Sequence, residues 1–163
     1  LSNNNLGKIS QRLQQMCCSS MDKLQSIWTR GCTNTDDFWE VVHTLPSCRV
    51  LIVDSIADIF RHETTNIPQR SLQFFRLVQH LRRLIATQHI QTVLILNQVS
   101  ANFNTSATEW TPALGLSWSH CVSVRYQVDK AANGCRSLTL AHSPNHAPHT
   151  LHFQVTQSGS VAL

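Results

Sequence analysis

Apolar positions recur at helical spacing in three stretches of the chain. The first covers residues 8–19, in which Ile9, Leu13 and Met16 fall on one face. The second covers residues 33–45, which begin with three possible capping residues, carry two acids in the first turn and end before a proline. Both stretches predict amphipathic helices.

The third and longest stretch predicts a helix from Pro68, a residue favoured in the first turn, to His89. We expect its apolar positions to pack on a sheet and its polar positions, several of them basic, to face water. The expected apolar face holds Leu72, Phe75, Val78, Leu81 and Ile85, and the opposite face holds Gln69, Gln73, Arg76, His80, Arg83 and Thr87.

Two shorter runs, residues 49–54 and 92–96, are almost wholly apolar and have the length of strands. Such runs are typical of parallel strands buried on both faces. The long helix between them fits a crossover that returns the chain to the same sheet. A further short strand is expected at Leu24–Thr29.

The pattern changes in the second half of the chain. Residues 99–111 lack a clean period and are rich in Asn, Ser and Thr, so they predict a loop longer than most connections. The strands expected after it are 121–128, 136–141, 150–156 and 160–163, with Gly134 and Gly159 at turns. We therefore expect one α/β domain, residues 1–163, in which parallel strands with crossover helices are followed by antiparallel edge strands.

The composition limits the compartments and the kinds of partner that we expect for the chain. A chain of 163 residues can bury one core, and none of its apolar runs is long enough to cross a bilayer, so no membrane partner is expected. Six cysteines without a CxxC pair favour a reducing compartment, nucleus or cytosol. Residues 67–163 carry seven basic and two acidic side chains, which suits a polyanionic partner or a solvated basic face.

Each dense apolar run is followed by polar side chains. The first leads into Asp54 and Ser55, the Walker B arrangement of P-loop ATPases, at the edge where open α/β sheets bind ligands. Asp54 could orient the Mg²⁺ that bridges the phosphates of ATP, usually through water. The second leads into Asn97 and Gln98, where Gln98 is the candidate catalytic side chain that senses a γ-phosphate. Alternatively, Asn97 and Gln98 only cap the strand end.

These features occur in an order that resembles the RecA-type recombinases. The resemblance is carried by Val50 to Ser55, Phe60-Arg61, Leu96 to Val99, Pro112-Ala113-Leu114-Gly115-Leu116-Ser117-Trp118, and Ser143-Pro144 followed by Pro148. Within the family it is closest to the eukaryotic DNA-repair paralogues, through Thr111 to Arg125 and Arg12-Leu13-Gln14-Gln15-Met16. Together the segments cover residues from about 12 to 160 in the family's order.

The resemblance implies an ATP-dependent DNA repair protein of homologous recombination, with ATP and Mg²⁺ as cofactors. Its expected partners are single-stranded or branched DNA and recombinase paralogue subunits, and its expected place is the nucleus, with the cytoplasm as a second compartment. The family's two DNA-facing loops correspond to Arg61–Gln69 and Ser100–Trp110. The residues expected at DNA are Arg61, Arg70, Asn102, Phe103 and Trp110, of which the arginines suit phosphates and the aromatic rings suit base stacking.

Some of these residues also fit simpler roles. Arg61 fits an exposed loop charge as well as a DNA contact, and Trp110 fits a side chain that anchors its loop. The second loop contains Glu109 and no Lys or Arg. This composition fits a protein that supports a recombinase better than one that exchanges strands itself.

By the same resemblance, Ser143, Pro144 and Pro148 would cap the nucleotide of a neighbouring subunit, although His142 stands where the core recombinases carry an acid. No GxxxxGKS/T motif occurs in the chain, so no backbone cradle or lysine for the β and γ phosphates is expected within it. We expect that segment and the family's catalytic glutamate to lie before Leu1, and the given residues alone not to hydrolyse ATP. The alternative is a non-enzymatic RecA-like adaptor that binds a partner paralogue without nucleotide.

Two other patterns point to different chemistry and are weaker. His142, His146, His149 and His152 have the residue type of zinc or copper ligands, but two prolines interrupt any helix that could align them, so a solvated loop is the default. A hydrolase triad built on Ser55 is not expected, because no GxSxG elbow surrounds this serine.

Overall fold

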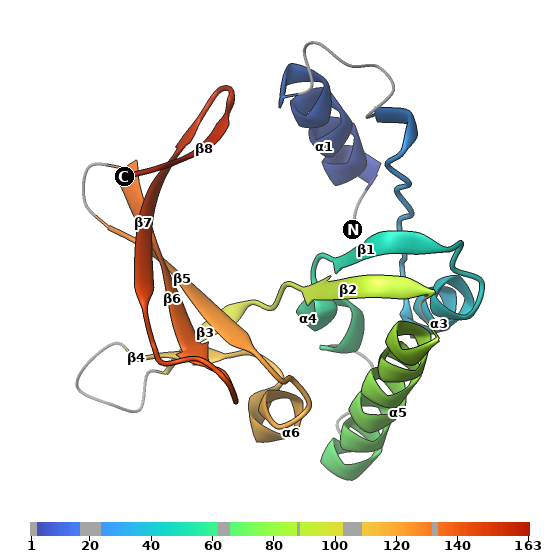
Figure 1. Ribbon diagram of the computed structural model, residues 1–163. Helices are drawn as coiled ribbons and strands as arrows, with labels where there is room; N and C mark the ends of the chain where they lie inside the picture. The colour runs from blue at the N-terminus through green and yellow to red at the C-terminus, as the bar shows by residue number, and fades with distance from the viewer. Residues whose placement is uncertain (1–2, 17–23, 62–65, 88, 103–108, 132–133) are drawn as a thin grey trace. The chain divides into compact units, whose positions relative to one another are not determined.

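The computed structural model describes residues 3–16, 24–61, 66–87, 89–102, 109–131 and 134–163 (Figure 1). They belong to two compact units, one of residues 32–121 and one of residues 1–31 with 122–163. Each unit has its own helices and sheets.

The unit of residues 32–121 contains both predicted apolar strands and the long helix. Its elements in chain order are α3 (Thr35–His43), β1 (Cys48–Val53), α4 (Ile56–Phe60), α5 (Ile67–Ala86), β2 (Ile90–Ile95), β3 (Val99–Asn102), β4 (Glu109–Pro112) and α6 (Gly115–Ser119). Asn34 caps α3 by accepting a hydrogen bond from the Asp37 amide at 2.8 Å. The positions of α3, α5 and both apolar strands confirm the elements predicted from periodicity.

Strands β1 and β2 pair in parallel, as predicted, and α5 packs against β2 (Figure 1). Burial of both faces was expected, and this is wrong for the described residues. Val50, Ile52 and Leu94 are 53%, 59% and 50% exposed, whereas Val53 is 8% exposed. Because successive side chains of a strand point to opposite faces, Val50, Ile52 and Leu94 share one face, and this face is largely uncovered beyond the buried Ile90 at its start.

A series of aromatic rings forms the centre of this unit. The ring centroids of Phe38 and Phe60 are 6.0 Å apart, those of Phe60 and Phe74 5.3 Å, and those of Phe74 and Trp118 5.4 Å, all edge to face. These four rings come from α3, α4, α5 and α6. The aromatic series therefore joins the helices of the unit into one core.

The buried face of α5 differs from the predicted one. Phe74, Leu77 and Leu81 are buried, whereas Leu72 and Phe75 are 49% and 54% exposed. A predicted stripe that advances in steps of three residues falls about 60° short of a full turn at each step, so it drifts around the helix. Of the expected apolar positions, only the one at Leu81 is fully buried.

Residues 99–111 were expected to form a loop, and the described part of them instead forms an antiparallel hairpin. In it Val99 lies opposite Pro112 and Asn102 lies opposite Glu109. The hairpin rests on backbone pairing, for which no apolar period is required. The strand expected from residue 121 begins only at Arg125, because the Cys121 amide still donates to the Trp118 carbonyl at 2.9 Å, at the end of α6.

The second unit contains α1 and an antiparallel meander. Its elements are α1 (Asn3–Met16), β5 (Arg125–Lys130), β6 (Cys135–His142), β7 (Thr150–Thr156) and β8 (Gly159–Ala162), and the strands pair in chain order. Gly134 and Gly159 have φ values of 77° and 131° beside the strand ends, where glycine was predicted at turns. The α/β class is confirmed, with the antiparallel strands in sheets of their own.

Two local features complete this unit. The Arg12 guanidinium of α1 donates to the carbonyl oxygen of Thr156 and, at 2.6 Å, to that of Gln157, which ties α1 to the turn after β7. The strand expected at Leu24–Thr29 does not form. No strand of the described residues pairs with it, and Trp28 is 81% exposed. A strand needs a pairing partner for its backbone, which an apolar composition alone does not supply.

Candidate functional site at the end of the parallel strands

The junction between β1 and α4 places two polar residues at the carboxyl end of the sheet. Asp54 is exposed, and no hydrogen bond or ion pair involves its side chain among the described residues. Ser55 is 5% exposed and caps α4, since its hydroxyl accepts from the Asp58 amide at 3.4 Å and donates to Asp58 Oδ2 at 2.8 Å. The peptide bond between Asp54 and Ser55 is cis.

The chain after β2 lies beside this junction because the parallel pairing continues past the strand ends. The Leu96 amide donates to the Val53 carbonyl at 2.9 Å, and the Ile56 amide donates to the Leu96 carbonyl at 3.0 Å. The residues that follow, Asn97 and Gln98, are thereby brought next to the start of α4.

Gln98 makes hydrogen bonds with both ends of its amide group. Its Oε1 accepts from the Arg61 guanidinium at 2.5 Å, and its Nε2 donates to Asp58 Oδ1 at 2.6 Å and to the Ser55 hydroxyl at 3.3 Å. We call these four residues, Ser55, Asp58, Arg61 and Gln98, the Gln98 network. The network connects the segment after β1 to the segment after β2.

Asn97 fastens the base of the β3–β4 hairpin. Its Nδ2 donates to the Ala113 carbonyl at 2.8 Å, and its Oδ1 accepts from the backbone amide of Gln98 at 3.0 Å. The Ala113 amide donates to the Gln98 carbonyl at 2.8 Å. Asn97 therefore makes the local hydrogen bonds expected of a strand-end residue, whereas the side chain of Gln98 reaches across to α4.

The structure brings only some of the sequence-predicted residues together. Asp54, Ser55, Asn97, Gln98 and Arg61 gather at the end of the parallel strands, where the Arg61 guanidinium is bonded to Gln98.

The other predicted residues lie elsewhere or outside the description. Arg70 is half-buried in the first turns of α5, and Ser143 and Pro144 lie between β6 and β7 in the second unit. The backbone of Asn102 and Trp110 belongs to the hairpin, but their side chains and the whole of Phe103 lie outside the described residues. Their proposed contacts with DNA or a neighbouring nucleotide stay predictions.

Sequence reasoning missed Asp58, which holds both the Ser55 hydroxyl and the Gln98 amide. A usable signal was present, because a serine followed three residues later by an acid at a strand-to-helix junction is a helix-capping pattern. The sequence did not reveal that Asp58 Oδ1 would accept a hydrogen bond from Gln98, which lies 40 positions away.

The described residues contain no group of three or more His, Cys, Asp or Glu side chains arranged to hold a metal ion, and the four histidines of residues 142–152 form no such group. None of the described helices combines the length and the apolar character that crossing a membrane requires.

Comparison with known proteins identifies the family. The Rad51 family model matches residues 39–162. DNA repair protein RAD51 homolog 3 of Cricetulus griseus is 28% identical over 143 residues, which are 83% of this chain and 38% of that protein. DNA repair protein XRCC3 homolog of Arabidopsis thaliana is 28% identical over 104 residues, 51% of this chain and 34% of that protein.

An archaeal relative gives the same result. DNA repair and recombination protein RadA of Metallosphaera sedula is 26% identical over 146 residues, 83% of this chain and 45% of that protein. The chain therefore spans less than half the length of these three relatives. The family match covers most of the chain and agrees with the ordered motifs, so the chain belongs to the Rad51 family, as a RecA-type recombinase paralogue of the XRCC3 kind.

Proposed function

We propose that this chain is part of an ATP-dependent DNA repair protein that acts in homologous recombination in the nucleus. The names of its relatives, DNA repair and DNA recombination proteins, support the pathway. The observation that carries the nucleotide part of the proposal is the Gln98 network beside the exposed carboxylate of Asp54.

The residues at this edge fit a role in orienting Mg²⁺. Mg²⁺ prefers oxygen ligands and keeps several waters, and an exposed carboxylate without another partner can order those waters. Asp54 meets this requirement, whereas both carboxylate oxygens of Asp58 are already engaged by Ser55 and Gln98. When bound, ATP supplies a γ-phosphate whose presence changes the charge near Asp54. The phosphates themselves would be bound by a GxxxxGKS/T motif, which these residues do not contain.

Gln98 is the residue that would communicate the nucleotide state. A γ-phosphate that attracts its amide group would compete with Asp58 for Nε2, and the displaced amide would release Arg61. The first proposed DNA loop begins at Arg61. The second follows Gln98 and returns to Ala113, whose backbone is held by Gln98 and Asn97. Gln98 thus contacts the first residue of one proposed DNA loop and directly precedes the other.

The proposed DNA contacts are the residues that the resemblance places in these loops, including Arg61 once it is released from Gln98. Arg70 suits a phosphate contact, since four arginines and no acid occur in α5. The proposed protein partners are recombinase paralogue subunits, toward whose nucleotide Ser143 and Pro144 would project.

Titration of the full-length protein with ATP tests the Mg²⁺ role of Asp54. The Asp54→Asn variant keeps the shape of the side chain and removes its charge, so ATP affinity in Mg²⁺ should fall by about 10- to 100-fold, as for residues that orient a bound metal. Asp36→Asn is the control, because Asp36 is an exposed acid in the first turn of α3, outside the network. Equal ATP affinity in the wild type and Asp54→Asn would rule out this role.

A second candidate is the adaptor that binds a partner paralogue without nucleotide. It is favoured by the exposed apolar face of the parallel sheet, formed by Val50, Ile52 and Leu94. Co-purification with a recombinase paralogue that survives Asp54→Ala and is lost on Ile52→Asp would support the adaptor. Loss of the complex on Asp54→Ala would support the ATP-dependent protein instead.

A further inference from the structure

The side chain of Gln98 is held at both ends by residues of α4 and of its C-cap. Gln98 Nε2 donates to Asp58 Oδ1 at 2.6 Å, and Gln98 Oε1 accepts from the Arg61 guanidinium at 2.5 Å. Asp58 and Arg61 are three residues apart, so they lie on the same side of the helix, about one turn from each other. The amide of Gln98 therefore lies between an acid and a base of one short segment.

The polarity of these two groups determines the orientation of the Gln98 amide. A side-chain amide has one donor end and one acceptor end, whereas a carboxylate only accepts and a guanidinium only donates. Rotation of the amide by half a turn would place its donor end against Arg61 and its acceptor end against Asp58. The two charged residues thus stabilise one orientation of Gln98 over the other.

Asp58 does more than complete the cap of α4. Its Oδ2 and its backbone amide both bond to the Ser55 hydroxyl, at 2.8 Å and 3.4 Å, as in a capped first turn. Its Oδ1 takes no part in the cap and holds Gln98 instead. Without Asp58, Gln98 Nε2 would retain only its bond to the Ser55 hydroxyl at 3.3 Å. A hydrogen bond to a carboxylate is about twice as strong as one between neutral groups, so Asp58 supplies most of the hold on Nε2.

We propose that Asp58 is a positioning residue that keeps Gln98 in its nucleotide-free orientation and thereby sets how readily the protein responds to ATP. The proposal rests on the proposed function, in which Gln98 leaves Asp58 to meet a γ-phosphate. Gln98 Nε2 cannot serve both acceptors in full, so the bond to Asp58 opposes the binding of ATP. It does not oppose the binding of ADP, which has no γ-phosphate. In the absence of ATP, Asp58 keeps both proposed DNA loops in their low-affinity state.

The expected effect follows from the fraction of molecules in which Gln98 is released. A ligand that needs a minor state binds with an affinity reduced by the fraction of that state. Loss of an exposed charge-assisted hydrogen bond should raise this fraction by about 5-fold, which converts to about 1 kcal/mol. Asp58→Ala should therefore raise the affinity for ATP by about 5-fold and leave the affinity for ADP within about two-fold of the wild type.

The test uses the full-length protein in calorimetric titrations with ATP and with ADP in Mg²⁺, and in fluorescence anisotropy with labelled oligo(dT) in the absence of nucleotide. In Asp58→Ala the nucleotide-free affinity for oligo(dT) should also rise by about 5-fold. Asp58→Asn retains an acceptor for Gln98 without the charge, so both affinities should lie between those of the wild type and Asp58→Ala. A residue that only capped α4 would lower stability when replaced and would raise neither affinity.

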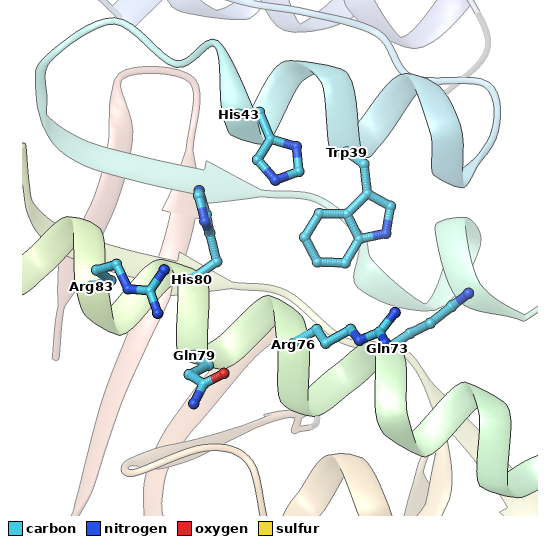
Figure 2. A pocket seen from close by; sticks show the side chains of 7 residues that line it. All are labelled: Trp39, His43, Gln73, Arg76, Gln79, His80 and Arg83. Carbon is cyan, nitrogen blue, oxygen red and sulfur yellow. The ribbon is translucent and has the colours of Figure 1, made fainter.

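Two control variants separate this effect from general ones. Asp36→Ala removes the same charge from the first turn of another helix in the same unit, and it should change oligo(dT) affinity by less than about two-fold because an exposed charge is screened. Gln79→Ala removes an amide that lines a polar hollow of about 410 Å³ between α3 and α5, to which the Gln98 network contributes no residue (Figure 2). It should leave all three affinities unchanged.

Unchanged affinities for ATP and oligo(dT) in Asp58→Ala would overturn the proposal. So would equal gains for ATP and ADP, or equal gains in Asp36→Ala and Asp58→Ala. Failure of the proposed function gives a different result, in which the DNA affinity of the wild type itself does not respond to ATP, and the role of Asp58 is then refuted with it.

Discussion

The hydrogen bond between Gln98 and Asp58 should contribute measurably to folding, and its contribution can be isolated with a double-mutant cycle. Gln98 Nε2 lies 2.6 Å from Asp58 Oδ1, and a hydrogen bond to a charged group contributes about 1.5–3 kcal/mol when buried. Because Asp58 is exposed, solvent screening lowers the expected coupling to about 1 kcal/mol. Asp58→Ala also removes an acceptor from the Ser55 hydroxyl, but that effect is shared by both arms of the cycle and cancels.

Urea unfolding of the full-length wild type, Asp58→Ala, Gln98→Ala and the double variant gives the coupling energy. Gln127 and Asp129 provide a matched control, because the amide of this Gln–Asp pair also donates to the carboxylate, at 3.0–3.1 Å, on the exposed surface of β5. The control pair should couple by less than about 0.3 kcal/mol. A Gln98–Asp58 coupling no larger than that of the control would refute the network as a structural unit.

Three other predictions concern stability and reactivity. Phe74→Ala should destabilise the protein by about 3–5 kcal/mol, because Phe74 is fully buried between two aromatic rings. Phe75→Ala should cost less than about 1 kcal/mol, because Phe75 is 54% exposed. Equal shifts of the urea midpoint in the two variants would contradict the observed buried face of α5. Gly159→Ala should lower stability by about 1 kcal/mol because φ is 131°, and an unchanged melting temperature would contradict this strain. Burial raises the pKa of the Cys121 thiol above its ordinary value of 9.0, against a smaller lowering by Arg82. Because Cys121 is buried and Cys48 only half-buried, a thiol reagent at pH 8 should modify Cys121 more slowly than Cys48; equal rates, assigned with Cys121→Ser, would contradict its burial. The same shift means that the stability from the protonated Cys121 thiol is present below pH 9 and is lost as the pH rises through the higher folded value.

Periodicity and strand length predicted the long helix α5 and the two parallel strands, but not which faces these elements bury. The two apolar runs became parallel strands, yet Ile52 and Leu94 are exposed. A dense apolar composition indicates that a strand favours burial, but it does not show which neighbouring element covers each of its faces. In α5 the adjacent residues Phe74 and Phe75 have the same hydropathy, so only the position of neighbouring helices determines which of them is buried.

The sequence predicted the residues of the candidate site that stand at the end of a strand. Asp54 and Gln98 follow apolar strands, and parallel pairing brings both strand ends to one edge of the sheet. The partners of Gln98 were not predictable, because Arg61 and Asp58 are 37 and 40 residues away and carry charges that fit an exposed surface equally well. Side-chain partners at such separation depend on tertiary contacts that sequence spacing does not encode.

The central claim is that Gln98 links the nucleotide to the two proposed DNA loops, and the most direct test is the effect of Mg²⁺ and ATP on affinity for single-stranded DNA. With the full-length wild type, the nucleotide should raise DNA affinity by about 5-fold or more, a coupling of at least 1 kcal/mol. In Gln98→Ala, ATP should still bind, but DNA affinity should no longer respond to it. An equal response to ATP in the wild type and in Gln98→Ala would contradict the claim.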